Sequence, residues 1–103
     1  MKALKIEGRR VELVEIPETN VRDELKALQT IIGGYIETVR IAVDAVMLVD
    51  EDGYVKCLPP NPAAAVLAGQ MILGTALVCG LAVNEDGEMY FSDCPECYYK
   101  ENA

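Results

Sequence analysis

The chain has 103 residues, of which 51% are apolar and 25% charged, and this composition fits one globular domain. Seventeen acidic residues against nine basic ones give a formal net charge of −8. Direct binding to nucleic acid is excluded on this basis, because the few basic residues do not cluster. The sequence also has no histidine, so the side chain that most often moves protons at neutral pH is missing.

Two short β-prone runs open the chain, at residues 2–7 and 10–16. Gly8 stands at the first central position of the two-residue connection between them, which is typical of an antiparallel hairpin. Pro17 ends the second run, because it has no backbone N–H to donate to a strand ladder.

A helix is predicted after Asn20, a residue type whose side-chain oxygen caps helix N-termini. Its apolar face recurs at spacings of four, three and four residues: Val21, Leu25, Leu28 and Ile32. Gly33 and Gly34 follow the helix and predict its C-terminal cap. They are not read as a phosphate cradle, which would precede a helix.

Strands are predicted on both sides of an acidic turn. Residues 35–42 alternate with polar groups on each face, and the more uniformly apolar residues 45–49 predict a buried strand. The turn over residues 50–53 then predicts a hairpin whose returning strand is 54–57. The acids of this turn are expected to be solvated, because the ligand pattern of a calcium loop is absent.

Residues 57–84 carry no charge, which makes a transmembrane helix an alternative that must be weighed. Prolines at one end and glycines spaced through the stretch argue against such a helix. We interpret the stretch as a loop over 58–62, a short helix over 63–67 and a buried central strand over 70–81. A last hairpin returns over residues 88–92.

These elements predict an α+β fold, an antiparallel or mixed β-sheet with one main helix packed on one face and a short second helix. We expect a single domain over residues 1–93 and a loosely held tail over 94–103. No apolar signal segment opens the chain, so a reducing cytosol without disulfides is expected. Cys94 and Cys97 form only half of a usual zinc motif. A structural or incidental role is expected for them, with metal or redox use as the alternative.

A series of motifs, taken in chain order, resembles a known family. The motifs are Leu28-Gln29, residues 31–37, residues 50–53, residues 58–63, residues 67–69 and residues 74–78. Over about residues 10–82 they resemble the family catalogued as domain of unknown function 3846. The resemblance implies a soluble protein of a phage, plasmid or conjugative element of Gram-positive bacteria, and it implies no established reaction. The segment between Pro62 and Gly69 is shorter than the family pattern, and the Cys94–Cys97 tail lies outside it.

Four residues are candidate ligand contacts: Gln29, Tyr35, Glu37 and Asn61. The first three lie at the predicted junction of helix and strand, where Tyr35 offers a stacking surface and the other two offer hydrogen bonds. Asn61 lies between two prolines that stiffen the backbone, so its amide would lose little entropy on binding. The structural alternative is a half-buried tyrosine, solvated polar groups and a turn-forming asparagine.

We predict a non-enzymatic binding protein with no catalytic residue, metal or cofactor, because the acid–base machinery is thin. The leading hypothesis is a homo-oligomer that sequesters a small nucleotide signal and so counters a host defence. The alternative partner is a basic host protein, bound by an acidic interaction module or DNA mimic that inhibits a nuclease. Residues 52–103 carry seven acids and two bases, which favours this alternative. An enzyme is the remaining class, and no contact with nucleic acid or membrane is expected.

Overall fold

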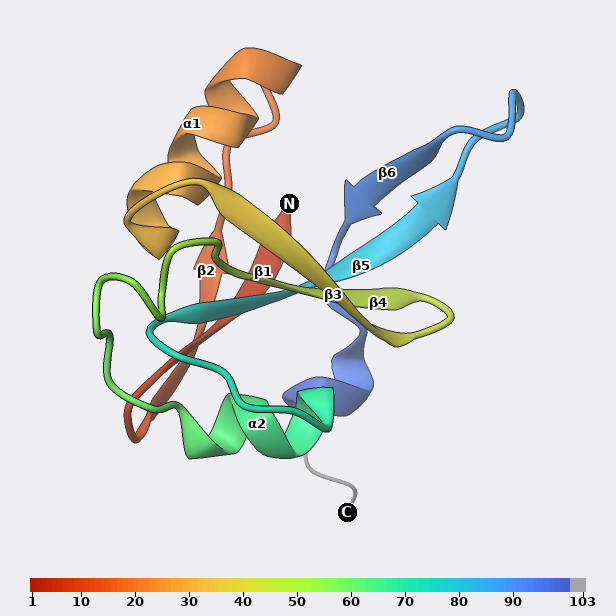
Figure 1. The fold of residues 1–103 in the computed structure, drawn as a ribbon. Helices are drawn as coiled ribbons and strands as arrows, with labels where there is room; N and C mark the ends of the chain where they lie inside the picture. The colour runs from red at the N-terminus through yellow and green to blue at the C-terminus, as the bar shows by residue number, and fades with distance from the viewer. Residues whose placement is uncertain (101–103) are drawn as a thin grey trace.

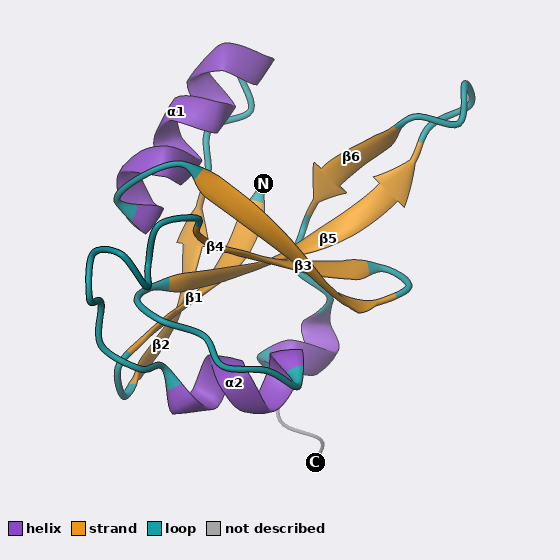
Figure 2. Cartoon of the chain, viewed as in Figure 1, coloured by secondary structure: helices purple, strands orange, loops and turns teal. Residues whose placement is uncertain are grey.

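The computed structural model describes residues 1–100 as a six-stranded antiparallel sheet with a helix on each face (Figures 1 and 2). The strands are β1 (Lys2–Glu7), β2 (Arg10–Glu15), β3 (Ile36–Ala42), β4 (Ala45–Asp50), β5 (Ala76–Val83) and β6 (Met89–Ser92). The helices are α1 (Val21–Ile32), α2 (Pro62–Ala68) and the short 3-10 helix η1 (Glu96–Tyr98). The predicted α+β class is confirmed, and every strand pair among the described residues is antiparallel.

β5 is the central strand of the sheet. The strand order is β2-β1-β5-β4-β3, and β6 also pairs with β5. Residues 76–78 of β5 pair with β1, and residues 80–83 pair with β6 along the same edge. The second half of β5 therefore leaves the sheet body together with β6 as a projecting hairpin, drawn in blue in Figure 1. We call residues 80–93 the arm.

The ends of α1 are formed as the sequence predicts. The Asn20 side chain accepts a hydrogen bond from the backbone N–H of Asp23 at 2.9 Å. At the other end, Gly33 adopts a left-handed conformation with φ of 91° and donates its N–H to the carbonyl of Gln29. A residue with a β-carbon adopts this conformation only at a cost, which is why glycine ends the helix here.

Only part of the apolar face of α1 is buried. Leu28 and Ile32 pack into a first core cluster with residues of β1, β4 and β5. Val21 and Leu25, from the same periodic series, are exposed. The N-terminal half of the helix projects past the edge of the sheet, as Figure 1 shows, so the periodicity predicts the helix but not how much of it is covered.

α2 covers the opposite face of the sheet. Ala64 of α2 and Ile72 of the following loop join a second core cluster with apolar residues of β1, β4 and β5. Pro62 is the first residue of this helix, a position where the missing N–H of proline costs nothing. The structure thus has two helices of unequal length, one on each face of the sheet.

The returning strand predicted over residues 54–57 is wrong. These residues form consecutive turns in which the N–H of Lys56 donates to the carbonyl of Asp52 at 2.9 Å. The N–H of Leu58 donates to the carbonyl of Gly53 at 3.0 Å. Because the segment satisfies its backbone locally, it needs no partner strand.

The uncharged stretch folds as loop, helix α2, a second loop and β5. Its strand begins at Ala76, so residues 70–75 of the predicted strand 70–81 lie outside it. Within residues 1–100, no helix is both long and apolar enough to cross a membrane.

The segment after β6 lies against the α2 face of the sheet. The backbone N–H of Cys94 donates to the carbonyl of Lys2 at 2.8 Å, and the Cys94 side chain is buried. Tyr98 and Tyr99 pack against the second core cluster. Within the tail predicted to be loosely held from residue 94 onward, Cys94, Tyr98 and Tyr99 thus contact the sheet, and residues 101–103 lie outside the described residues.

Candidate functional site

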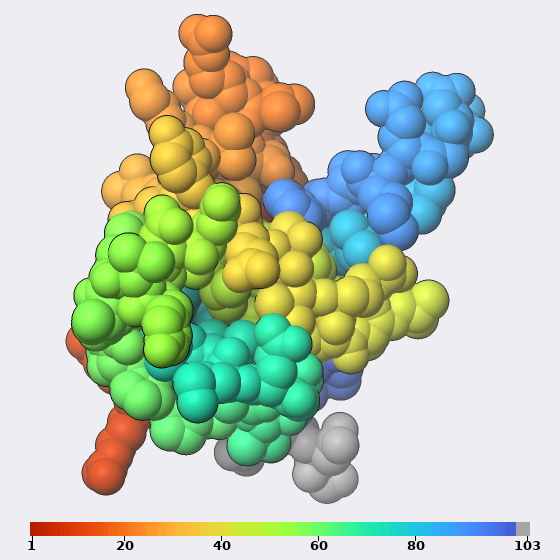
Figure 3. All heavy atoms as spheres, viewed as in Figure 1, coloured from red at the N-terminus to blue at the C-terminus, as the bar shows by residue number. Residues whose placement is uncertain are grey.

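The candidate site lies where three connections meet: residues 33–35 after α1, residues 50–57 after β4 and residues 70–73 after α2. Strand pairing brings the first two together, since β3 and β4 are aligned with Ile36 opposite Asp50. In Figure 3 the green segment that follows β4 and the teal segment that follows α2 face the yellow β3 on the front of the molecule. Loops that converge on one end of a sheet are a common setting for binding sites.

An ion pair between a buried carboxylate and a partly exposed lysine joins two of these connections. Lys56 Nζ lies 2.8 Å from Asp50 Oδ2 and also donates to the carbonyl of Gly33 at 3.1 Å. The Asp50 side chain is only 2% exposed, whereas that of Lys56 is 39% exposed. The hydrogen bond from Lys56, helped by one from the Asp52 N–H, holds the pKa of Asp50 below its usual value despite burial.

Gly34 makes room for this pair. A β-carbon at this position would lie 2.6 Å from Lys56 Nζ and 3.0 Å from Asp50 Oδ2. The sequence predicts both glycines as a helix cap, and Gly33 has that role. Gly34 instead permits a close approach, so the glycine pair and the acidic turn, which are distant in sequence, form one structural unit.

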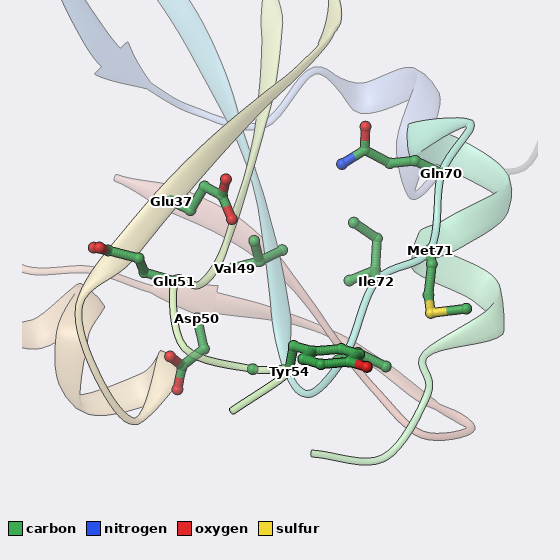
Figure 4. A pocket seen from close by; sticks show the side chains of 10 residues that line it. Glu37, Val49, Asp50, Glu51, Tyr54, Gln70, Met71 and Ile72 are labelled. Atoms are coloured by element: carbon green, nitrogen blue, oxygen red, sulfur yellow. The ribbon is translucent and has the colours of Figure 1, made fainter. Parts of the chain in front are cut away.

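A cleft of about 210 Å³ opens beside this unit, and we call it the β4 cleft. It is lined by Glu37, Val49, Asp50, Glu51, Gly53, Tyr54, Gln70, Met71, Ile72 and Leu73. In Figure 4 the carboxylate of Glu37 lies on the wall opposite Gln70, and the side chain of Glu51, next to Glu37, points away from Gln70. The ring of Tyr54 lies at one end, while the Asp50 carboxylate turns away from the cavity.

A second, more open hollow of about 450 Å³ touches the same acidic turn through Asp52. Its other lining residues are Gln29, Gly34, Tyr35 and Lys56. The predicted junction patch is therefore divided. The structure brings Gln29 and Tyr35 together in this hollow, and it places Glu37 in the β4 cleft.

Asn61, the fourth predicted contact, lies elsewhere and is buried. Its amide donates to the carbonyls of Ile6 and Gly74 at 2.9 Å each, and its oxygen accepts from the N–H of Ala64 at 3.2 Å. Both amide hydrogens are used within the fold. Asn61 therefore caps α2 and ties it to β1, and it presents nothing to a ligand.

The sequence interpretation missed four residues of the site: Asp50, Tyr54, Lys56 and Gln70. It treats Asp50 as a solvated turn acid and places Tyr54 and Lys56 on a strand. One signal was available, since Asp50 directly follows a run of apolar residues in a buried strand. An acid in that position is itself buried unless the chain turns at once, and a buried acid needs a partner.

Two of the four cysteines, Cys79 and Cys94, are buried in the core clusters. Burial raises the pKa of Cys79 to about 12 and that of Cys94 to about 11, so both thiols stay protonated at neutral pH and are poor nucleophiles. Within residues 1–100, no three His, Cys, Asp or Glu side chains are grouped so as to hold a metal ion. The groups that the β4 cleft does offer are carboxylates, an amide and an aromatic ring, which suit hydrogen bonding and stacking.

The family model described as "Domain of unknown function (DUF3846)" matches residues 1–100. The match extends beyond the motifs at residues 28–78 and includes the Cys94–Cys97 segment. No curated protein and no solved structure matches the chain. The chain belongs to this family.

Proposed function

We propose that this member of the family is a non-enzymatic binding module that captures a small ligand in the β4 cleft, with a nucleotide as the first candidate. The observation that carries the proposal is the arrangement of three side chains from three separate segments around one cavity. Glu37 comes from β3, Tyr54 from the turns after β4 and Gln70 from the loop after α2. Such convergence of a few polar groups and a ring in a cleft is typical of a ligand site.

The cleft matches the base of a nucleotide better than its phosphates. Glu37 can accept hydrogen bonds from the amino and imino groups of a base, and the Gln70 amide can both donate and accept. Tyr54 is 84% exposed, which leaves its ring face open to stacking. A cavity of about 210 Å³ is smaller than the roughly 300 Å³ at which drug-sized pockets begin, so it takes a base rather than a whole nucleotide.

The charged side chains in and beside the cleft determine how a nucleotide would be oriented. Glu37 and Glu51 make the cleft acidic and repel a phosphate placed inside it. Lys56 lines the neighbouring hollow on the far side of the acidic turn. The phosphate end of the ligand therefore points out of the cleft toward this hollow, where Tyr35 and Gln29 lie.

The biological setting belongs to the same proposal. A protein that sequesters a nucleotide signal would serve a phage or another mobile element by blunting a defence of its host, in the host cytosol. We propose further that copies of the chain associate, because two large apolar side chains are exposed, Met71 in the lining of the cleft and Val55 next to Tyr54 in the sequence. Native mass spectrometry of protein purified from cells tests subunit number and any bound small molecule together.

Isothermal titration against a panel of linear and cyclic nucleotides tests the proposal directly. We expect heat from at least one nucleotide at micromolar protein, and chromatography of the recovered ligand should show it unchanged. If no nucleotide of the panel gives heat, the assignment of a nucleotide ligand is overturned. Conversion of the ligand would overturn its non-enzymatic part.

Two tyrosine variants locate the site. Tyr54→Ala removes the ring at the β4 cleft, and we expect it to weaken binding by about tenfold, which corresponds to one stacking contact. Tyr35→Ala removes the ring of the neighbouring hollow and should weaken binding less. Tyr90→Ala on the arm is the matched control. If Tyr35→Ala has the larger effect, the ligand occupies the hollow and the cleft assignment fails.

A second candidate function is the acidic interaction module, and a separate observation favours it. The arm carries Glu85, Asp86 and Glu88 around its tip, and no lysine or arginine occurs between residues 57 and 99. Binding of this surface to a basic protein should weaken steeply as ionic strength rises, because exposed charges are screened within about 10 Å at 0.1 M salt. Affinity that does not change with salt would count against this candidate.

A further inference from the structure

We infer that the outer edge of β6 is a docking site for an extended basic segment of a partner protein, which adds to the sheet as a further strand. This inference rests on the acidic-interaction candidate and is independent of the β4 cleft. The site is the groove between α1 and β6, with a volume of about 490 Å³. Glu18, Glu24, Tyr90, Phe91, Ser92 and Asp93 line it. In Figure 3 the groove is the open notch between the orange helix and the blue arm.

The backbone of β6 has a free edge in this groove. Within residues 1–100, β6 pairs only with β5. The N–H of Asn84 donates to the carbonyl of Glu88 at 2.9 Å, which makes these two residues a hydrogen-bonded pair of the ladder. Because such pairs alternate along an antiparallel ladder, Met89 and Phe91 direct their N–H and C=O groups away from β5. These groups form the row that an added strand would use.

The acidic side chains around this edge of β6 favour a basic segment as the bound partner. Glu24 faces the groove from α1, and within residues 1–100 its carboxylate forms no ion pair. Glu18 is 3.2 Å from the amino group of Met1, and Asp93 accepts a hydrogen bond from the N–H of Lys2, so these two acids are partly engaged. The acids of the arm tip lie at the far end of the same edge. A basic segment would be steered to this edge by the field of these carboxylates.

The same charges disfavour a second copy of this chain at the site. Two copies paired through β6 would bring two acidic arms side by side, and like charges across a strand pair are destabilising. The carboxylates therefore act against self-pairing, as charged residues on edge strands generally do. They leave the edge open to a partner of opposite charge.

The two faces of the sheet specify the side chains of the bound segment. Phe91 packs with the core cluster that α1 covers, so its face of the added strand lies toward Glu18 and Glu24. Tyr90 lies on the opposite face and is half exposed. The expected segment thus alternates, with lysine or arginine toward α1 and apolar residues beside Tyr90.

An eight-residue peptide of alternating lysine and valine, blocked at both ends, is the probe, with the glutamate–valine peptide as its control. Amide chemical shifts of the intact chain are recorded while each peptide is added. We expect the basic peptide alone to shift residues 88–93 and 18–24, and to bind more weakly as salt rises. Shifts confined to any other surface would overturn the groove while leaving an acidic module standing. No binding of the basic peptide anywhere would overturn both.

Substitutions test the backbone edge separately from charge. Met89→Pro removes one outward N–H and no hydrogen bond to β5, so it should weaken the basic peptide by about tenfold, whereas Met89→Ala keeps the N–H and should change binding little. Glu24→Gln should weaken binding about two- to fivefold, as expected for an exposed charge pair. Glu12→Gln on β2 makes the same charge change far from the groove. Equal effects of the proline and alanine variants would overturn strand addition.

Discussion

The β4 cleft and the arm are both exposed regions of one sheet, yet they are held in opposite ways. In the body of the sheet, polar side chains are bonded to the fold itself: Asp50 to Lys56 beside the cleft, and Asn61, away from the cleft, to the backbone of β1 and α2. The arm is held by main-chain pairing between β5 and β6, while Val83, Met89 and Tyr90 are exposed. Side-chain hydrogen bonds and an ion pair therefore hold the region of the cleft in place, whereas the arm has few side-chain bonds.

Because of this difference, a substitution near the cleft should affect both stability and binding, whereas a substitution on the arm should affect only binding. A polar substitution in the scaffold of the cleft lowers the free energy of unfolding and alters the site at once, because buried groups lose their partners. A substitution on the arm changes what the surface presents and leaves the rest of the fold intact. Each expectation below is a way to break this contrast or to sharpen it.

Asn61→Ala should have the largest effect. It leaves the carbonyls of Ile6 and Gly74 and the N–H of Ala64 without their partner, and we expect the free energy of unfolding to fall by about 3 kcal/mol. Asn84→Ala is the matched control, since the side chain of that asparagine also bonds to the backbone, accepting from two N–H groups, but in an exposed turn of the arm. Urea denaturation measures both, and equal losses would contradict the contrast.

Lys56→Met should have a smaller effect. It leaves Asp50 buried without its cation, and because water already screens the partly exposed lysine we expect a loss of about 1–2 kcal/mol. Lys100→Met removes an equally short but exposed ion pair to Glu96 and should leave stability unchanged. The Asp50→Asn, Lys56→Met double variant should recover part of the loss. A double variant no more stable than Lys56→Met would argue that the buried charge is not the cause.

Low pH should break the ion pair between Asp50 and Lys56. The pKa of Asp50 in the folded chain lies below its ordinary value of 3.8 because Lys56 hydrogen-bonds the charged form. Its contribution is therefore complete above pH 3.8 and is lost as the pH falls through the lower, folded pKa. We expect the stability difference between the native chain and Asp50→Asn to shrink as the pH falls from about 4 to about 2. A difference that stays constant over this interval would show that Asp50 is not ionised in the fold.

Val83→Thr on the arm should have the smallest effect. The side chain is 57% exposed, and we expect a change within about 0.5 kcal/mol. Val46→Thr makes the same exchange in β4, where the residue is buried in the first core cluster, and should cost about 1–3 kcal/mol for the buried hydroxyl. Thermal unfolding of both variants checks the pair. A large loss at Val83 would mean that the arm packs more firmly than its exposure indicates.

The local elements of the fold are readable in the sequence because their signals are local. Asn20 and Gly33 bound α1 through their own conformations, and Gly8 turns the first hairpin. The prediction places the start of β5 too early because residues 70–75 are uncharged and include Met71, Ile72 and Leu73, and an apolar run does not distinguish loop from strand. The strand order is not readable, since nothing local reports that β1 and β6 share one edge of β5.

The candidate site was only partly predictable for a related reason. Glu37 and Tyr35 are predicted contacts because they follow a glycine turn, and the structure exposes both at the converging loops. Lys56 was missed because its role depends on consecutive turns that bring it back to Asp50. Asn61 is predicted as a ligand contact because the prolines on both sides of it are visible in the sequence. The carbonyls of Ile6 in β1 and of Gly74, which accept both of its amide hydrogens, are distant in the sequence.

The central place of β5 also orders events during synthesis. When the ribosome has made the first 75 residues, the hairpins β1–β2 and β3–β4 exist in the nascent chain, but the strand that joins them has not been made. Neither hairpin can complete a sheet alone, since two strands are marginal in water. The sheet therefore stays incomplete until β5 emerges, and a ribosome stalled before residue 76 would hold a protease-sensitive chain.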